Sequence, residues 1–148
     1  MANICENTVE VIGTEKDILE MRQFLEQNKK GLLNALVPSP ETSDYKQSLS
    51  WTSKYWGTKS DVVLEHISHF DQTLSFDFES AWTPPVEGFE ALAKKFPGVK
   101  IILAWVEYGL DFSGSATYYD GRLMELFERQ TASVSATMTI PAIKEEEK

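Results

Sequence analysis

The stretch FDFESAWTPPVEGFEALAKKFPGVKIILAW, residues 76–105, predicts a strand, a helix and a second strand in succession. Apolar and polar residues alternate from Leu74 to Glu79, which is the period of a half-buried strand. Thr83 can cap the following helix with its hydroxyl group, and Pro84 suits a first helical position, where a missing N–H is tolerated. We therefore expect the helix to begin at Pro84.

The predicted helix has one apolar stripe and a defined end. Phe89, Leu92 and Ala93 recur at helical spacing, and Pro97-Gly98 terminates the pattern. Residues 99–106 are then almost continuously apolar, which is typical of a central strand covered on both faces. The three segments together predict a strand–helix–strand unit with a right-handed crossover.

The first thirty residues predict a second unit of the same kind. Residues 3–12 alternate as a strand, with Cys5 and Val9 on its apolar side. Thr14 and Asp17 resemble a capping box at the start of a helix that reaches about residue 28. The expected buried face of this helix consists of Ile18, Met21 and Leu25.

The segments that remain predict a long connection and two hairpins. Residues 29–60 are irregular but rich in aromatic side chains, which argues against disorder, and they predict a loop with a short helix that ends at Gly57. Residues 61–70 suit a strand or a short helix, and we predict a strand that forms a hairpin with residues 73–80 through a turn at Asp71-Gln72. Asp120-Gly121 is a strong hairpin signal between two further alternating segments. Beyond these, residues 131–140 suit either an edge strand or a tail.

These segments together predict an α+β fold. Their order matches a ferredoxin-like βαββαβ unit with an antiparallel sheet, an inserted aromatic loop with a short helix, and an extra C-terminal β-hairpin. Both helices are expected on the same face of the sheet. We expect one domain over residues 1–141 and a charged, disordered tail over residues 142–148.

Composition narrows the classes of function. The chain has 148 residues and a net charge of −9, which argues against sequence-independent binding of nucleic acid. No apolar run approaches the ~20 residues that span a bilayer, and no signal peptide is visible, so we expect no membrane association. The single cysteine, Cys5, excludes an internal disulfide and suits a buried, inert thiol in the cytoplasm.

Five short motifs carry a family resemblance. They are Met1–Thr8, Trp56–Lys59, Ala81–Pro85, Phe96-Pro97 and the segment Glu107–Gly114. In this order they resemble the Api92-like proteins of phages and plasmids, which contain a ferredoxin-like domain of unknown function. The resemblance covers about residues 1–121, and it implies the fold and a mobile-element origin but no activity.

No motif reaches the specificity of a catalytic, cofactor or metal signature. There is no glycine-rich phosphate loop and no nucleophile elbow. His66 and His69 are three residues apart, and in a strand this odd separation places them on opposite faces, which removes them as a metal pair. We therefore predict no cofactor and no metal site.

Four residues at the ends of predicted elements are candidates for a site. Glu107 and Asp111 follow the predicted central strand, where paired carboxylates either perform acid–base chemistry or hold a bend through turn amides. Trp56 and Trp82 either anchor their loops or contribute to a partner surface. For all four residues the structural interpretation is the favoured one.

The strand order of a ferredoxin-like sheet suggests an acidic surface. The first strand lies beside the strand at 73–80, so four carboxylates would share the polar face: Glu6, Glu10, Asp77 and Glu79. Like charges on neighbouring strands repel, and Lys100 could form an ion pair with only some of these carboxylates. We therefore hypothesise that the helix-free face is an acidic docking surface for a basic partner.

Three functions stay open from the sequence. The favoured one is a non-catalytic interaction domain that binds a host protein through this acidic surface. An alternative is a small enzyme of unknown reaction near Trp56, Trp82, Glu107 and Asp111, which a deep pocket with carboxylates of raised pKa would support. A third is a homo-oligomeric structural protein, because an uncovered apolar sheet face would self-associate.

Overall fold

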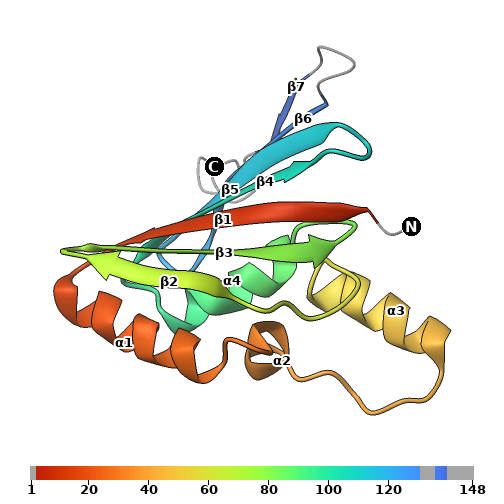
Figure 1. The fold of residues 1–148 in the computed structure, drawn as a ribbon, viewed down its shortest axis with the longest axis horizontal. Coiled ribbons are helices and arrows are strands. Elements are labelled where there is room, and N and C mark those ends of the chain that lie inside the picture. Colours follow the sequence, from red (N-terminus) through yellow and green to blue (C-terminus); the bar gives the residue numbers. More distant parts are fainter. Residues whose placement is uncertain (1–2, 131–135, 140–148) are drawn as a thin grey trace, which may run out of the picture.

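β1 (Ile4–Ile12) lies between β3 and β4 in a seven-stranded antiparallel sheet of order β2-β3-β1-β4-β5-β6-β7 (Figure 1). The computed structural model describes residues 3–130 and the backbone of residues 136–139. The other elements are α1 (Glu15–Gln27), α2 (Leu32–Leu36), α3 (Tyr45–Tyr55), β2 (Glu65–Phe70), β3 (Thr73–Ala81), α4 (Val86–Lys95), β4 (Lys100–Glu107), β5 (Phe112–Tyr119), β6 (Arg122–Gln130) and β7 (Ala136–Thr139). The element and strand orders confirm the predicted ferredoxin-like α+β fold.

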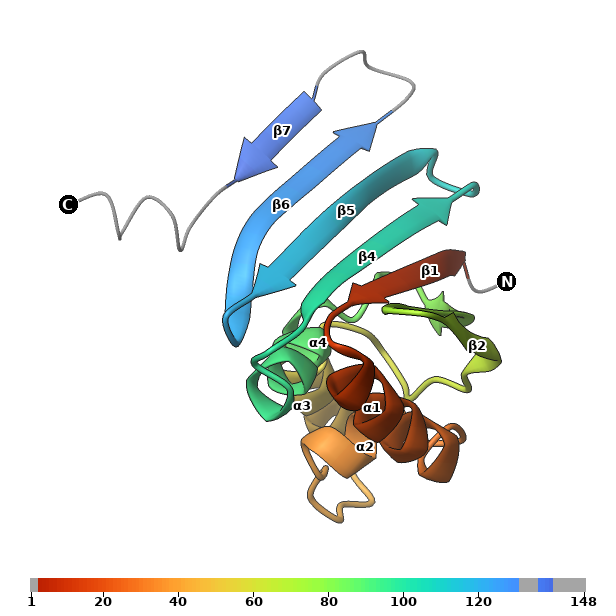
Figure 2. The same cartoon turned by 90° about the vertical axis from the view of Figure 1, so that its left-hand side faces the viewer.

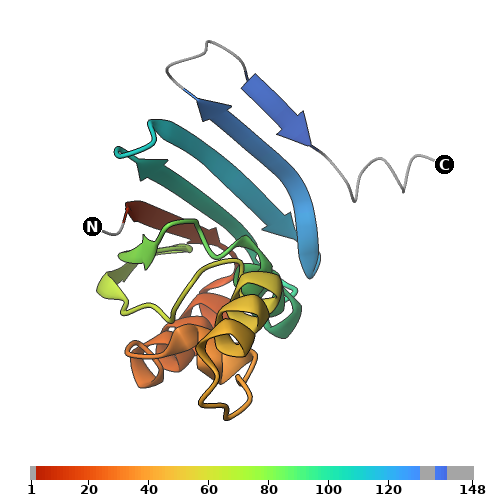
Figure 3. The same cartoon turned by 90° about the vertical axis from the view of Figure 1, so that its right-hand side faces the viewer.

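The helices cover a single face of the sheet, as the sequence predicts. Figures 1 and 2 show α1 and α4 on the same side of β1, β3 and β4, while β5, β6 and β7 extend the sheet beyond them (Figures 2 and 3). The two helices meet through Phe24 and Phe96, whose ring centroids are 5.6 Å apart. Phe89 of α4 packs on Phe78 of β3, with their ring centroids 5.6 Å apart. The core therefore lies between these helices and strands β1, β3, β4 and β5.

The first strand and helix form as their local sequence predicts. The hydroxyl of Thr14 accepts a hydrogen bond from the backbone N–H of Asp17 at 3.2 Å, which satisfies one free amide of the first turn. Ile18, Met21 and Leu25 are fully buried. Cys5 of β1 is fully buried too, and desolvation, followed by the charge of Glu107, raises the pKa of its thiol to about 12.

The start of α4 differs from the prediction. The helix begins at Val86, its cap residue Pro85 makes no side-chain capping bond, and the Thr83 hydroxyl donates to the carbonyl oxygen of Gly57 at 2.6 Å. The reason is the second proline, because a residue that precedes a proline is disfavoured in helical conformation and Pro84 precedes Pro85. Thr83 therefore ties the loop to the end of α3 instead of capping a helix.

The prediction that β4 is covered on both faces is also wrong. Ile101, Leu103 and Trp105 are buried against the helices, whereas the alternate residues are only partly buried and Val106 is 36% exposed. Because α1 and α4 lie on the same side, no helix covers the opposite face. Its apolar residues in β4 border on water, as strand-forming residues can in an antiparallel sheet.

The long connection between α1 and β2 contains two helices. Asp61 accepts hydrogen bonds from the backbone N–H groups of Leu33 at 2.8 Å and Asn34 at 3.0 Å, and so caps α2. Trp56 follows α3, and Gly57 has a φ of +82°, a conformation that glycine adopts readily, so the predicted end of a short helix here is confirmed. β2 begins at Glu65, later than predicted, because Asp61 serves this capping contact and the backbone N–H of Leu64 donates to the carbonyl oxygen of Lys29 at 2.7 Å.

The C-terminal strands follow the predicted hairpin. Asp120 and Gly121 both have positive φ, which is the conformation of a two-residue hairpin turn of type I′. Residues 136–139 pair with β6, which places an edge strand within the segment where strand and tail were alternatives. The predicted tail, residues 142–148, lies outside the described residues. Within the described ranges, no helix has the length and apolar character needed to cross a membrane.

Replacing Gly114 of β5 by alanine should lower the free energy of unfolding by about 1–3 kcal/mol in urea denaturation. A Cβ atom there would overlap the carbonyl oxygen of Phe127 and would lie 2.6 Å from Cζ2 of Trp105. Gly31→Ala is the control, because its Cβ would meet no atom closer than 3.4 Å. A Gly114→Ala variant as stable as wild type would contradict this packing of Trp105 against β5.

Candidate functional site

Four carboxylates lie together on the side of the sheet opposite the described helices (Figures 1 and 2). Alternation along β1 turns Glu6 and Glu10 away from the core, and alternation along β3 does the same for Asp77 and Glu79. The ladder between the two strands sets Glu6 directly opposite Glu79 and Asp77 opposite Thr8. We call the surface formed by Glu6, Glu10, Asp77 and Glu79 the acidic face.

In the described part of the chain, no lysine or arginine neutralises the charges of the acidic face. Within residues 3–130, none of its four carboxylates forms an ion pair with a lysine or arginine. Lys100, which could form an ion pair with some of these carboxylates, lies opposite Ile12, at the end of β1 away from Glu6. Glu6, Asp77 and Glu79 line a shallow hollow of about 280 Å³. The surface is therefore a strongly negative patch that contains a small hollow.

β2 adds two residues to this patch that the sequence did not predict there. Glu65 lies opposite Asp77, and Nδ1 of His66 is 3.0 Å from Oδ2 of Asp77. A regular strand would place Glu65 and His66 on opposite faces, but here the register shifts between Glu65 and Ser68 and His66 has a φ of +57°. The hydrogen bond to Asp77, followed by the charge of Asp77, raises the pKa of His66.

The two histidines lie apart, as the strand prediction implies. His69 contacts α1, where its Nδ1 is 2.7 Å from the guanidinium of Arg22, while His66 contacts Asp77 on the acidic face. They do not form a metal pair.

The other four candidate residues do not converge on a common site. Trp56 is buried, and its indole N–H donates to the carbonyl oxygen of Val37 at 2.9 Å. Trp82 is 41% exposed, has a φ of +73°, and carries the ammonium of Lys59 4.4 Å from its ring centroid. The two tryptophans thus differ: one anchors the long connection, and the other remains available to a partner.

Glu107 and Asp111 belong to the turn between β4 and β5. Glu107 is fully buried, and its carboxylate accepts hydrogen bonds from the backbone N–H groups of Gly109 and Leu110. Asp111 has a φ of +63° in the same turn. The carboxylate of Glu107 thus holds the bend through turn amides.

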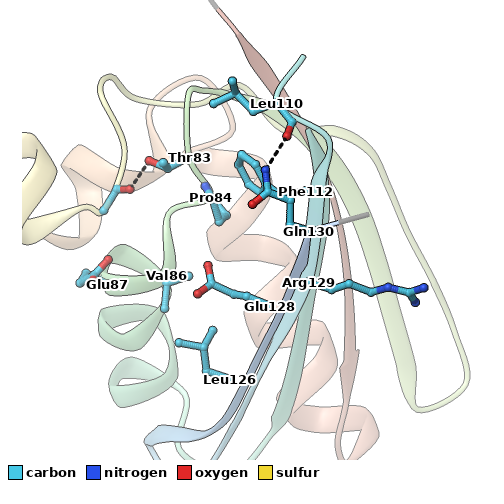
Figure 4. Close-up of a pocket in the computed structure, with 11 residues that line it drawn as sticks. Thr83, Pro84, Val86, Glu87, Leu110, Phe112, Leu126, Glu128, Arg129 and Gln130 are labelled. Carbon is cyan, nitrogen blue, oxygen red and sulfur yellow. Dashed lines mark hydrogen bonds between the residues drawn. The ribbon is translucent and has the colours of Figure 1, made fainter. Parts of the chain in front are cut away.

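A groove opens elsewhere, between the first turn of α4 and the concave side of β5 and β6 (Figure 4). It has a volume of about 730 Å³. Its apolar lining consists of Pro84, Val86, Leu110, Phe112 and Leu126, and its carboxylates are Glu87 and Glu128. Figure 4 shows the Glu128 carboxylate directed toward Val86 and the Arg129 side chain directed away. None of Trp56, Trp82, Glu107 and Asp111 lines this groove.

Glu87 is a residue of the groove whose pKa is shifted. Its carboxyl group is partly desolvated against Gly57, where an added Cβ atom would overlap Oε1 of Glu87. Desolvation, with smaller contributions from the charges of Glu90 and Glu128, raises the pKa of Glu87. The sequence offered no signal for this pairing of α4 with β6, because it depends on how the C-terminal strands curve.

A comparison with known protein families shows which family the chain belongs to. The family described as "Ferredoxin-like domain in Api92-like protein" matches residues 55–147, which is more than half of the chain. The chain belongs to this Api92-like family. The matched range extends further toward the C-terminus of the Api92-like chain than the motif resemblance, which ended near residue 121, and it does not include the first motif.

A solved structure supports the fold of this Api92-like chain. The crystal structure of the protein api92 from Yersinia pseudotuberculosis aligns with a TM-score of 0.60 and 9% sequence identity. The alignment covers 85% of this chain and 97% of that one. At this identity the likeness establishes the fold alone. No curated protein matches the sequence.

The raised pKa of Glu87 predicts how its replacement affects stability. Since the folded pKa lies above the usual 4.5, ionisation favours the unfolded chain, and the free energy of unfolding falls as pH rises from 4.5 through the folded value. Glu87→Gln should therefore stabilise the Api92-like domain at pH 7, by less than about 1 kcal/mol for this partly exposed group, and should flatten that decline.

Urea unfolding between pH 4 and pH 7 measures this effect, and Glu20→Gln, an exposed carboxylate on α1 that does not contribute to the pKa of Glu87, is the control. A Glu87→Gln variant that is less stable than wild type at pH 7 would contradict the desolvation of this carboxyl group.

Proposed function

We propose that this Api92-like chain is a non-catalytic interaction domain of a phage or plasmid that binds a host protein through the acidic face. The supporting observation is that Glu6 lies directly opposite Glu79 on an open sheet surface, and that no lysine or arginine among residues 3–130 forms an ion pair with either. Like charges at directly opposed positions destabilise a sheet. The free domain therefore keeps a repulsion that a basic partner would convert into attraction on binding.

The surroundings of the acidic face suit a protein partner. Ile4 and Ile12, at the two ends of β1, are 42% and 40% exposed, and Val106 of β4 lies opposite Glu6. Protein interfaces combine apolar contacts with charged groups that determine orientation and the rate of association. A partner with lysine or arginine side chains beside an apolar patch fits this arrangement, and it would bind less tightly as salt screens the charges.

Charge reversal tests the proposal. A variant with Glu6, Glu10, Asp77 and Glu79 all changed to lysine should no longer capture the host protein that wild type retains from a host lysate, as measured by mass spectrometry. The control reverses four exposed carboxylates on the helix side, Glu15, Glu20, Glu26 and Glu41, and should retain it. Equal capture by both variants, or capture that is insensitive to salt, would overturn the proposal.

The same repulsion makes a separate prediction for the free domain. Glu79→Gln removes the charge opposite Glu6 and should raise the free energy of unfolding by several tenths of a kcal/mol, up to about 1 kcal/mol. Glu20→Gln, an exposed carboxylate on α1, is the control and should change stability less. Thermal unfolding at low and high salt checks the cause, because added salt should shrink the difference between wild type and Glu79→Gln.

A second candidate function is a small enzyme, favoured by the raised pKa of Glu87 in the groove. The acid–base residues would then be Glu87 and Glu128 and not the pair Glu107 and Asp111, because Glu107 is buried in its turn. A fragment screen by NMR tests this candidate. Fragments that shift the amides of Val86 and Leu126, and that lose affinity in Glu87→Gln, would support it.

A further inference from the structure

We propose that Glu65, His66 and Asp77 form a binding site for a divalent transition-metal ion such as Zn²⁺. Their ligand atoms, one imidazole nitrogen and two carboxylate oxygens, all lie within 4.8 Å of one another. The histidine distinguishes this site from a cluster of acids alone, because imidazole is a preferred ligand of zinc, cobalt and nickel, whereas magnesium and calcium take oxygen ligands. The site shares Asp77 with the acidic face, but it rests on ligand geometry and not on partner binding.

The backbone of β2 brings the donors together. In a regular strand, the consecutive residues Glu65 and His66 would point to opposite faces of the sheet. The register shift after Glu65 and the positive φ of His66 instead direct the imidazole toward Asp77, which is also the ladder partner of Glu65. Two adjacent strands thus supply three ligands on the same surface.

The site can contract around an ion. Zinc binds nitrogen and oxygen at about 2.0–2.2 Å, so ligands in a tetrahedral site lie about 3.3 Å apart. The side chains of His66 and Asp77 are 78% and 40% exposed, and they can rotate by the small amount needed to close from 4.8 Å. Water would complete the coordination, as would Glu6 or Glu79 from the adjoining hollow.

Electrostatics favours a cation at this position. Glu65 and Asp77 are directly opposed carboxylates, and Glu6 and Glu79 form a second such pair in the same hollow. Within residues 3–130, no lysine or arginine forms an ion pair with any of these four. A divalent ion would neutralise two of these charges and remove the repulsion between β2 and β3.

Isothermal titration of ZnCl₂ and CoCl₂ into the untagged full-length chain tests the site. Wild type should bind one ion, and His66→Asn should weaken binding by more than about tenfold. Asparagine is chosen because it tolerates a positive φ and so preserves the backbone. His69→Asn is the matched control, since it removes the other of the two histidines, which contacts Arg22, and it should bind as wild type does.

Two further measurements, on Asp77→Asn and by NMR with Co²⁺, test where the ion binds. Asp77→Asn should also weaken binding, and Co²⁺ should perturb the NMR signals of Glu65 and Asp77 more than those around His69. Wild type that binds neither metal, His66→Asn that binds as tightly as wild type, or a loss in His69→Asn would each overturn it. Calcium bound equally by wild type and His66→Asn, with no zinc or cobalt binding, would show a nonspecific acidic patch and overturn it as well.

Discussion

The structure depends on one packing arrangement: α1 and α4 bury their apolar stripes on the same face of β3, β1 and β4. Fully buried residues from both helices meet there, namely Ile18, Met21, Leu25, Phe89 and Leu92. Burying such a side chain contributes about 1.5–3 kcal/mol. Five of them are comparable with the whole net stability of a domain, which is about 5–15 kcal/mol, so neither helix can leave the sheet without unfolding it.

This one-sided cover determines where functional groups can lie. Every second residue of β1 and β3 must face water, and in this chain several of those residues are carboxylates. The ladder then sets Glu6 against Glu79, so the same register that buries Cys5 and Val9 creates the acidic face. The groove has a different origin, because it forms where β5 and β6 extend past the covered part of the sheet and meet the start of α4.

The features that the sequence predicted well depend on neighbouring residues or on strand order. The Thr14 cap and the Asp120-Gly121 turn are determined locally. The gathering of the four carboxylates follows from alternation combined with the strand order of the fold.

The features that the sequence did not predict depend on local exceptions or distant contacts. Pro84 could not begin the helix because a second proline follows it. The bulge that turns His66 toward Asp77 breaks the alternation on which strand prediction relies. Glu87 and Glu128 line the same groove although they lie about 40 positions apart in the sequence, and no periodicity encodes the contact of α4 with β6 that brings them there.

The most direct test of one-sided packing is the rate of thiol alkylation by iodoacetamide, a neutral reagent that the acidic face does not repel. Thr8 lies on the open face of β1, and Cys5 is fully buried on the helix side of the same strand. In a Thr8→Cys variant, the introduced thiol should be alkylated in the folded protein, more slowly than in an unfolded chain because the neighbouring carboxylates disfavour its thiolate, while Cys5 reacts only after denaturation. Protection of the introduced thiol, or a Cys5 that reacts rapidly in the folded protein, would contradict the account.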